Sequence, residues 1–402
     1  MLIKKPELLA PVGNYDMLMA AINNGANAVY FGLDRLNMRA KAKNFSLENL
    51  GNVVDLCKQN SVDTHLTLNT IIYNNELKDL DTIISEAKNV GVDLIICWDL
   101  AVIQKCIKYD MPFCISTQAS ISNIDSALFY KNLGAKRIVL ARECTLDMIK
   151  EIKQNVDVEI ETFIHGAMCV AISGRCFMSH SIFNKSANRG ECIQPCRRNY
   201  EIKDKDQGYE LELGSDYVLS PKDICTVEFI DLLIDAKIDA FKIEGRKRSP
   251  EYIAKVVSTY RKAIDAYYNK NLTGELKTEM VKELNKVYNR GFSNGFYLGL
   301  PSSNDFATIY GSAATTKKEY LGKVTNFYKK SNIALLHIEA GTLAVGDSIY
   351  ISGQTTGIVE LEVKSLMIDD IVVNNAKQGD RPTIVCDHSI RERDLVYKIV
   401  QK

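Results

Sequence analysis

One pattern recurs along the first 250 residues and limits the folds that this chain can adopt. A helix-like segment ends at glycine or another small residue, and a short run of apolar, often β-branched residues follows. Clear examples are INNGANAVYFG (22–32), KNVGVDLIICW (88–98), KNLGAKRIVLAR (131–142) and IDAKIDAFKIEG (234–245). Glycine suits the left-handed position that closes a helix, and continuous apolar runs are typical of strands buried on both faces of a parallel sheet. The pattern therefore predicts repeated β–α units.

Eight such strands are expected, each followed by a helical stretch. Their ranges are Leu8–Val12, Ala28–Phe31, Val62–Leu68, Leu94–Cys97, Phe113–Ser116, Ile138–Ala141, Val158–Ile164 and Ala240–Ile243. Eight units predict an α/β fold with a parallel (β/α)8 TIM-like barrel. An open doubly wound sheet is the alternative, but no G-x-G-x-x-G motif follows the first strand, which disfavours a dinucleotide-binding version of it.

Polar residues follow several of these strands, at the end of the barrel where active sites usually lie. They are Asn14, Asn69, Asp99, Gln118, Arg142, Glu143, His165, Glu244 and Arg246. Taken singly, each is more simply a loop residue or a helix cap. Together they combine acidic, basic and neutral polar side chains, and such a combination suits a small anionic ligand.

The β–α spacing breaks down between Gly166 and Asp216, after the seventh strand. Four of the chain's 11 cysteines fall in this segment: Cys169, Cys176, Cys192 and Cys196. Structureless loops of this length inside a compact domain are usually functional. The segment at about 166–216 is therefore predicted to be an insertion at the catalytic end of the seventh strand.

The cysteine spacing, C-x6-C-x15-C-x3-C, indicates a metal. Zinc sites normally use closer pairs, whereas iron–sulfur clusters accept irregular spacings because each iron takes one thiolate and sulfide completes its shell. Without an export signal the thiols are expected to face a reducing cytoplasm, which favours metal or redox chemistry over disulfides. An iron–sulfur cluster is favoured, with zinc and free or redox-active thiols as alternatives. Cys225 is an alternative to Cys196 as the fourth ligand.

Composition excludes some other classes of protein. The 402 residues include 50 basic and 50 acidic side chains, which argues against a surface that coats nucleic acid by charge alone. No run approaches the roughly 18–20 apolar residues of a membrane helix, so no membrane association is expected. The sequence carries no signal for an oligomeric state.

A second domain is expected after the Gly/Ser/Asn-rich stretch NRGFSNGFYLGLPSSND (289–305). From about Tyr320 the sequence shows short alternating strands with regular turns, which predict a small C-terminal antiparallel β-barrel. The expected domains are residues 1–305, the barrel with its insertion, and residues 318–402.

Several stretches resemble the peptidase U32 family, long labelled collagenase-like proteases. ETFIHGAMCVAISGRCFMS (161–179) is similar to its signature, and other matching stretches are LLAPVGN (8–14), LTLNT (66–70), STQAS (116–120), NRGECIQPCR (188–197), LSPKD (219–223) and KIEGR (242–246). The resemblance spans about residues 5–300, and the C-terminal strands are similar to an appended small β-barrel of the family.

The resemblance implies an oxygen-independent hydroxylase with a [4Fe–4S] cluster. Members of this kind act on the tRNA wobble uridine, a ribosomal RNA cytidine or ubiquinone precursors, and prephenate is implicated as the hydroxyl source in the RNA-modifying members. In length and in the extra barrel the chain is most similar to the tRNA hydroxylation proteins, which form 5-hydroxyuridine. By resemblance, Cys169, Cys176, Cys192 and Cys196 are the cluster ligands, with Cys196 or Cys225 left open as the fourth.

The leading hypothesis is a cytoplasmic enzyme that hydroxylates a tRNA uridine, with prephenate bound at the mouth of the barrel. From strand-end position, Arg142, Lys242 and Arg246 are the predicted anion contacts, and His165 and Glu244 are assigned polar or proton-transfer roles. One alternative is a U32-type peptidase, although the sequence has no G-x-S-x-G or H-E-x-x-H motif. Others are hydroxylation of ribosomal RNA or a quinone precursor, and a non-catalytic RNA- or partner-binding module with a structural metal.

Overall fold

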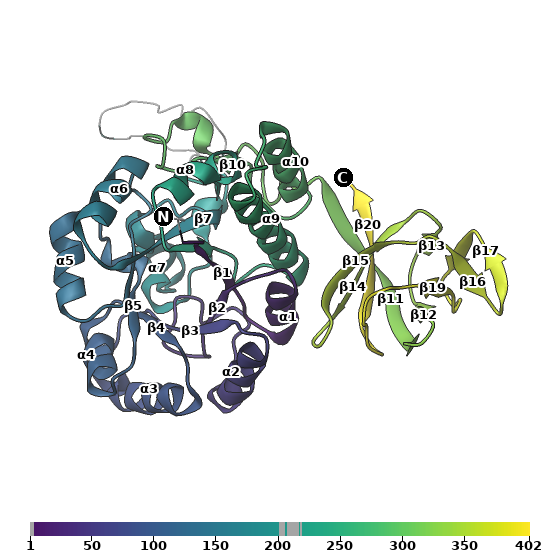
Figure 1. Cartoon of the computed structure of the whole chain (residues 1–402), viewed down its shortest axis with the longest axis horizontal. Coiled ribbons are helices and arrows are strands. Elements are labelled where there is room, and N and C mark those ends of the chain that lie inside the picture. The colour runs from purple at the N-terminus through teal and green to yellow at the C-terminus, as the bar shows by residue number, and fades with distance from the viewer. Residues whose placement is uncertain (1–3, 201–205, 207–216, 218) are drawn as a thin grey trace.

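The computed structural model describes residues 4–200, 206, 217 and 219–402. Figure 1 shows a ring of helices around a central barrel, with a separate β region joined to it through the strand β11. The barrel carries a cavity lined by residues of its strands and of the insertion.

Eight parallel strands form the barrel, as the sequence predicts. They pair in the order β7-β6-β5-β4-β3-β2-β1-β9, and a further pairing of β7 with β9 closes the ring. Their bounds are β1 Glu7–Pro11, β2 Ala28–Phe31, β3 Asp63–Leu68, β4 Leu94–Cys97, β5 Phe113–Ile115, β6 Arg137–Val139, β7 Glu159–Ala167 and β9 Ala240–Ile243. The (β/α)8 prediction is confirmed, and each predicted strand overlaps an observed one.

Helices follow the strands and cover the outside of the barrel (Figure 1). They are α1 Tyr15–Asn23, α2 Leu50–Gln59, α3 Leu77–Val90, α4 Leu100–Lys108, α5 Ile124–Asn132, α6 Leu146–Asn155, α8 Ile230–Asp235, α9 Pro250–Tyr268 and α10 Gly274–Asn285. Two of the polar strand-end residues take the simpler role of helix cap. The Oδ1 atoms of Asn14 and Asp99 accept hydrogen bonds from the first turns of α1 and α4, which satisfies N–H groups that have no partner within the helix.

A paired charge network lies inside the barrel among apolar side chains. Glu161, which is fully buried, accepts a 2.6 Å bond from Lys242 Nζ and a 3.3 Å bond from Arg137 Nη1. Arg137 also bonds Glu7 and Glu159. Burial raises the pKa of Glu161, but Lys242 and Arg137 outweigh it and leave that pKa below its ordinary value. We call Glu7, Arg137, Glu159, Glu161 and Lys242 the interior network.

The insertion leaves the C-terminal end of β7, as predicted. It contains the short helix α7, Met178–Phe183, and ends before β8, Asp223–Cys225, which pairs antiparallel with β7; β10, Phe292–Ser293, extends the sheet beside β8. Arg189 ties the insertion to the barrel by bonding Glu76. The predicted limits of about 166–216 include residues 201–205 and 207–216, which lie outside the described part of the chain.

The C-terminal region is antiparallel, as predicted, and has its own apolar core. An eight-stranded sheet and a two-stranded sheet are described. The strands are β11 Thr316–Tyr328, β12 Ile333–Ile338, β13 Thr342–Ala344, β14 Ser348–Gly353, β15 Gly357–Glu362, β16 Leu366–Ile368, β17 Ile371–Val373, β18 Asn375–Lys377, β19 Thr383–Val385 and β20 Leu395–Gln401. The predicted domain limits, 1–305 and 318–402, stay predictions.

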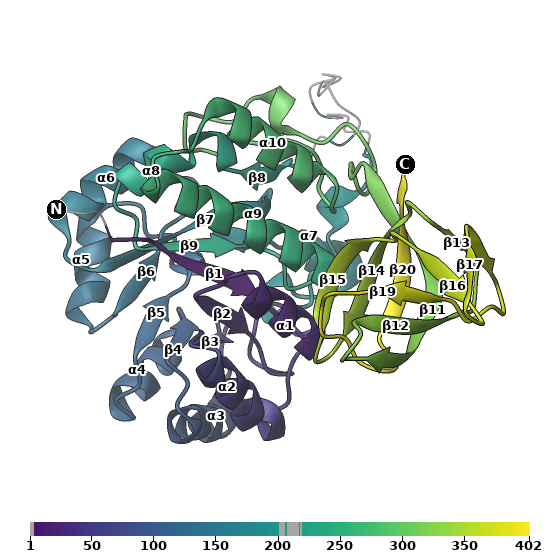
Figure 2. The same ribbon diagram turned by 45° about the vertical axis from the view of Figure 1, so that its right-hand side comes forward.

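Strand β15 of the C-terminal region packs against helices of the barrel. Figure 2 shows it beside α1, and a side chain at Gly357 would collide with the backbone of α1 at Ala20, 2.8 Å from its Cβ. Lys255 on α9 pairs at 3.0 Å with Glu360 on β15. The C-terminal sheet therefore packs on the outside of the barrel, away from its central cavity.

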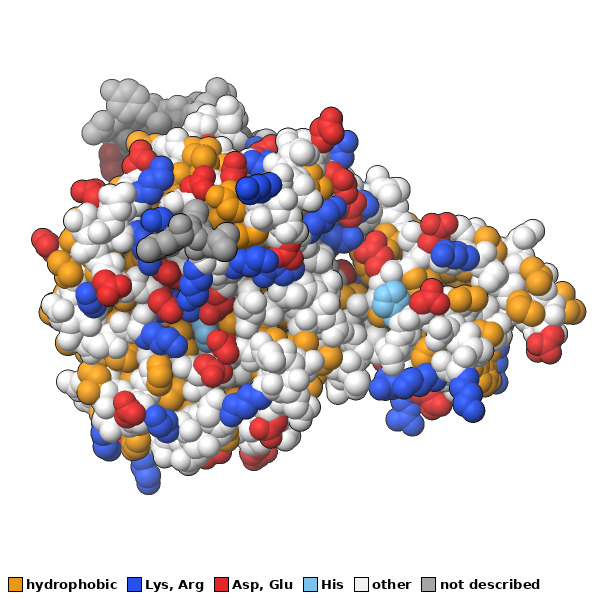
Figure 3. Space-filling model, viewed as in Figure 1, with side chains coloured by type: hydrophobic (Ala, Val, Ile, Leu, Met, Phe, Trp, Pro, Cys, Tyr) orange, Lys and Arg blue, Asp and Glu red, His pale blue; other side chains and the backbone are white. Residues whose placement is uncertain are grey.

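Two surface properties agree with the composition. Within the described residues, no helix is long and apolar enough to cross a bilayer. Figure 3 shows acidic and basic side chains interspersed over the face turned to the viewer.

Candidate functional site

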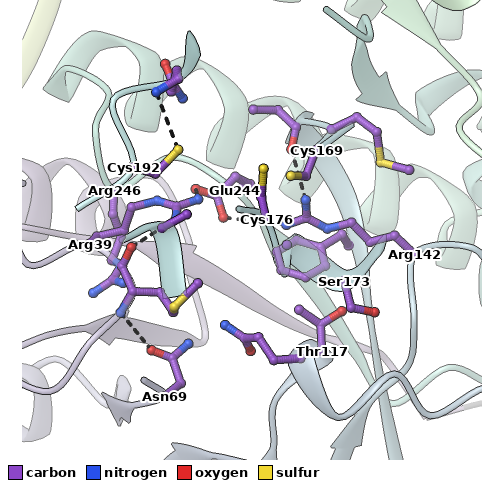
Figure 4. A pocket seen from close by; sticks show the side chains of 18 of the residues that line it. Arg39, Asn69, Thr117, Arg142, Cys169, Ser173, Cys176, Cys192, Glu244 and Arg246 are labelled. Atoms are coloured by element: carbon purple, nitrogen blue, oxygen red, sulfur yellow. Dashed lines mark hydrogen bonds and ion pairs between the residues drawn. The ribbon is translucent and has the colours of Figure 1, made fainter. Parts of the chain in front are cut away.

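A cavity lies over the C-terminal ends of the barrel strands, beneath the insertion. It encloses about 1210 Å³, part of it open to solvent, and residues from β2, β3, β4, β6, β7, β9, the segment after β5 and the insertion line it. Figure 4 shows Cys169, Cys176 and Cys192 near Glu244, with Arg39 and Arg246 on one side and Arg142 on the other. The insertion and the strand ends therefore build one site.

The end of β9 and the residues that follow it supply three charged side chains. Lys242 lies on β9, Glu244 and Arg246 follow the strand, and all three line the cavity. Lys242 lies at the floor, where Glu161 already holds its ammonium. Arg246 Nη1 donates to Asn37 Oδ1 at 3.0 Å and to Thr67 Oγ1 at 3.1 Å. The structure places these three strand-end residues on one cavity, and their roles in binding or catalysis stay predictions.

Glu244 lies among guanidinium groups. Arg39 Nη2 donates to it at 3.2 Å, and Arg142 Nη2 lies 3.7 Å away. Burial alone would raise the pKa of Glu244, but Arg39, Arg142 and Arg246 lower it to about 2. At neutral pH Glu244 is therefore a carboxylate that accepts hydrogen bonds and cannot donate a proton.

The cavity carries a large excess of positive charge. Among the described residues that line it, Glu244 is the one carboxylate, against six cationic side chains: Arg39, Arg142, Arg197, Lys242, Arg246 and Lys247. Arg142 retains unused donor capacity, because its buried Nε has no hydrogen-bond partner in the described structure. An anion, rather than a neutral ligand alone, would balance this charge.

All four cysteines of the insertion line the same cavity, and none is in a disulfide. The backbone N–H groups of Met178 and Gln194 each lie 3.4 Å from a sulfur, Cys176 Sγ and Cys192 Sγ respectively. Burial raises the pKa of Cys196 to about 11, and the other three thiols of the insertion contribute to this rise. The thiols therefore share one electrostatic environment.

The fit to a metal is incomplete in one respect. Within the described residues, no group of three or more His, Cys, Asp or Glu side chains could hold a metal ion as they stand. The donor set suits a cluster, since the sulfurs are unpaired, two accept backbone N–H bonds and cations surround them. Binding would require the insertion to draw its thiols closer together.

Cys225 and His165 lie outside the cavity. Cys225 is buried on β8, with its sulfur 3.8 Å from Tyr260 Oη, so it does not share the cavity with the four cysteines of the insertion. His165 Nδ1 lies 3.3 Å from the same hydroxyl, and burial together with Arg248 lowers the pKa of His165 to about 3. The side chain of His165 therefore lies apart from the cavity, against Tyr260.

A β-bulge explains the position of His165. Glu161 and Phe163 face the barrel interior, and strict alternation would turn His165 the same way. The register of β7 on β9 shifts between Phe163 and His165, and a bulge of this kind re-aims the side chains that follow it. His165 instead packs against Tyr252 and Tyr260 on α9.

Two lining residues were missed from the sequence. Arg39 lies in the loop after β2, far from a strand end, and meets Glu244 across 205 positions of sequence. Ser173 belongs to the insertion and has a left-handed backbone, with φ of 48°. Neither residue lies next to the end of a predicted strand, so the strand-end argument does not find them. The local density of Arg and Lys around Arg39 is a weak signal in the sequence.

Comparison with known proteins agrees with this picture. Residues 13–306 match the family described as Peptidase family U32. A protein named collagenase from Porphyromonas gingivalis is 39% identical over 404 residues, covering 98% of this chain and 97% of that protein. An uncharacterized protease of Methanocaldococcus jannaschii is 42% identical over 400 residues, covering 97% of each chain.

A relative named for a different activity is also similar. The tRNA hydroxylation protein P1 of Bacillus subtilis is 36% identical over 340 residues, covering 83% of this chain and 80% of that protein. Names for proteolysis and for RNA hydroxylation thus occur among proteins that align with most of this chain. The chain belongs to the peptidase U32 family.

Proposed function

We propose that this protein is a cytoplasmic iron–sulfur enzyme that hydroxylates a tRNA uridine to 5-hydroxyuridine without dioxygen, with prephenate as the hydroxyl source. One observation carries the proposal: four unpaired thiols and six cationic side chains line the same cavity, with one carboxylate among them. A thiolate-bound cluster and a carboxylate co-substrate are both anionic, so the two together would offset this charge.

Cys169, Cys176, Cys192 and Cys196 would hold the cluster, since they share the cavity and Cys225 does not. A bound [4Fe–4S] cluster supplies electron transfer or, at an iron without a protein ligand, a site for an oxygen-bearing substrate. The N–H···S contacts from Met178 and Gln194 would stabilise the thiolate form. Unpaired cysteines throughout the chain are consistent with a reducing compartment.

Arg142 is the best-placed contact for a carboxylate of the co-substrate. Its buried Nε has no partner, and its Nη2 lies 3.7 Å from Glu244. Arg246 already bonds Asn37 and Thr67, and Lys242 already bonds Glu161, so these two add mainly positive charge. Glu244, with a pKa of about 2, positions the guanidinium groups.

The test combines metal analysis with an assay of modification. Protein purified without oxygen should contain iron and sulfide, and with prephenate it should form 5-hydroxyuridine in unmodified tRNA, detected by mass spectrometry of nucleosides. Cys196→Ala should lose iron, whereas Cys225→Ala should retain it. A zinc-containing protein without iron, or equal iron in both variants, contradicts the proposed cluster.

Peptide hydrolysis is the second candidate, because two long-aligned relatives carry protease names. The geometry gives it little support: the described lining residues include no histidine to activate a cysteine. Enzyme-like peptide cleavage by metal-free protein, retained in Cys169→Ala, would favour hydrolysis over hydroxylation.

A further inference from the structure

One wall of the cavity differs chemically from the rest. Asn69, Ser116, Thr117 and Gln118 line it at the ends of β3 and β5, and Ser173 joins them from the insertion. None of these side chains is charged, whereas Arg39, Arg142 and Arg246 lie around Glu244. Figure 4 shows Asn69 and Thr117 across the cavity from Cys192 and Cys169. We call these five residues the neutral wall.

We propose that the neutral wall is a separate subsite that receives a pyrimidine base of single-stranded RNA by its hydrogen-bonding edge, uracil in preference to cytosine. The choice of RNA as the ligand rests on the proposed function, while the subsite itself rests on the hydrogen-bonding groups of the wall. The anionic co-substrate then occupies the cationic side of the cavity.

A chain of hydrogen bonds fixes how the two amides face. Asn69 Nδ2 donates to Ser116 Oγ at 3.4 Å, and Ser116 Oγ in turn donates to Gln118 Oε1. Asn69 Oδ1 accepts from the backbone N–H of Met38 at 3.1 Å. Both amide oxygens are therefore occupied, and the amides have N–H donors left for a ligand. Within the described residues, Gln118 Nε2 has no protein partner.

Ser173 provides an independent sign of a missing ligand. Its residue is 3% exposed, it lines the cavity, and its Oγ has no hydrogen-bond partner in the described structure. A buried hydroxyl without a partner is unfavourable, so such groups usually have a ligand or water as their partner. The backbone of Ser173 is fixed by its N–H bond to Glu143 Oε1 at 3.2 Å.

The available groups fit uracil better than cytosine. Uracil presents two carbonyl oxygens on either side of an N–H, whereas cytosine presents an amino donor, a ring nitrogen that accepts and one carbonyl oxygen. Two amide donors and a hydroxyl that can accept complement the uracil edge. Apolar Met38 and Ile96 also line the cavity, next to Asn69 and on the strand between β3 and β5, and can pack against the faces of the ring.

The experiment measures binding to short RNA independently of catalysis. Two five-nucleotide RNAs, with one central uridine or cytidine between adenosines, are titrated against the anaerobically prepared holoenzyme by fluorescence anisotropy. The wild-type protein should bind the uridine strand at least fivefold more tightly. Gln118→Glu replaces the donor with an acceptor, which suits the amino group of cytosine, and should reverse this preference. Gln104→Glu on the exposed face of α4 is the matched control and should leave it unchanged.

A second variant guards against misfolding of the first. Ser173→Ala removes the unpartnered hydroxyl, so it should weaken uridine binding about fivefold, while its unfolding midpoint stays equal to or above that of the wild type. Equal binding of both strands by the wild type, or an unchanged preference in folded Gln118→Glu, overturns the subsite. If Gln118→Glu reverses the preference but the wild-type protein forms no 5-hydroxyuridine, the subsite is supported and the proposed function is rejected.

Discussion

The barrel holds two groups of charges, one above the other, that differ in how well they are balanced. In the interior network, Arg137 meets three carboxylates and Glu161 meets two cations. In the cavity above, six cationic side chains surround one carboxylate. Lys242 belongs to both groups, with its ammonium held from below by Glu161. Balanced charges stabilise a fold only if every partner stays in place, whereas unbalanced charges are available to a ligand.

Breaking the balanced group should have the largest effect on stability. Glu161→Gln keeps the shape of the side chain but leaves Lys242 and Arg137 without their shared buried counter-charge. We expect the free energy of unfolding to fall by about 3–5 kcal/mol, the usual result of removing one partner from a buried ion pair. Denaturant unfolding followed by circular dichroism measures this change.

Glu159→Gln is the matched control for that variant. The Glu159 side chain is 29% exposed and, within the described residues, forms an ion pair only with Arg137, which retains Glu7 and Glu161. Loss of this ion pair should lower the free energy of unfolding by no more than about 1 kcal/mol. If both variants lowered the free energy of unfolding equally, the burial of Glu161 would not make it more important to stability than Glu159.

Breaking the unbalanced group should affect binding more than stability. Arg142→Gln removes the guanidinium group proposed to contact the co-substrate, and Arg39 and Arg246 remain around Glu244. Under the proposed function, the dissociation constant for prephenate should rise about 10- to 100-fold, as expected for a lost charge-assisted hydrogen bond. Isothermal titration calorimetry measures it. Arg35→Gln, at an exposed pair with Asp79, should change nothing, and tight prephenate binding by Arg142→Gln would contradict the assignment of Arg142.

The sequence predicts the barrel and part of the site for clear physical reasons. Strands buried on both faces must be apolar, so runs such as Leu94–Cys97 stand out and match the observed strand. Because active sites of such barrels lie at the C-terminal ends of the strands, the position of Lys242, Glu244 and Arg246 at and after the end of β9 indicates the cavity that they line. The four insertion cysteines are close in sequence, so their meeting at one cavity also followed from their density.

Other parts of the site depend on contacts that no local pattern encodes. Arg39 reaches Glu244 because the ends of β2 and β9 both flank β1 in the closed ring. The bulge in β7 that turns His165 outward depends on how β7 pairs with β9. The roles of Asn14 and Asp99 as caps and of Gln118 in the cavity could not be separated, because all three follow strands and look alike in sequence.

The smallest expected effect concerns how the interior responds to an added proton. Burial lowers the pKa of His65 well below its usual range; Arg137 and Lys242 lower it further, and Glu161 opposes them. His165, buried beside Arg248, has a pKa lowered to about 3. Both histidines are thus neutral in the folded protein but bind protons in the unfolded chain below its ordinary pKa of about 6.5. Their contribution to stability is complete above pH 6.5 and is lost as pH falls below it.

Each histidine should therefore contribute up to about 1.4 kcal/mol of lost stability per pH unit below 6.5. The slope of the unfolding free energy against pH, measured between pH 7.5 and pH 5.5, reports how many protons the chain takes up on unfolding. His65→Gln and His165→Gln should each lower this number by one, and the double variant should lower it by two. If His65→Gln left the slope unchanged, His65 would be protonated in the folded state, and the interior network would tolerate an added positive charge. The interior network and the cavity would then differ only in where they lie, because both would hold unbalanced positive charge. A smaller slope in His65→Gln would mean that the interior excludes added charge, whereas the cavity has positive charge available to an anion.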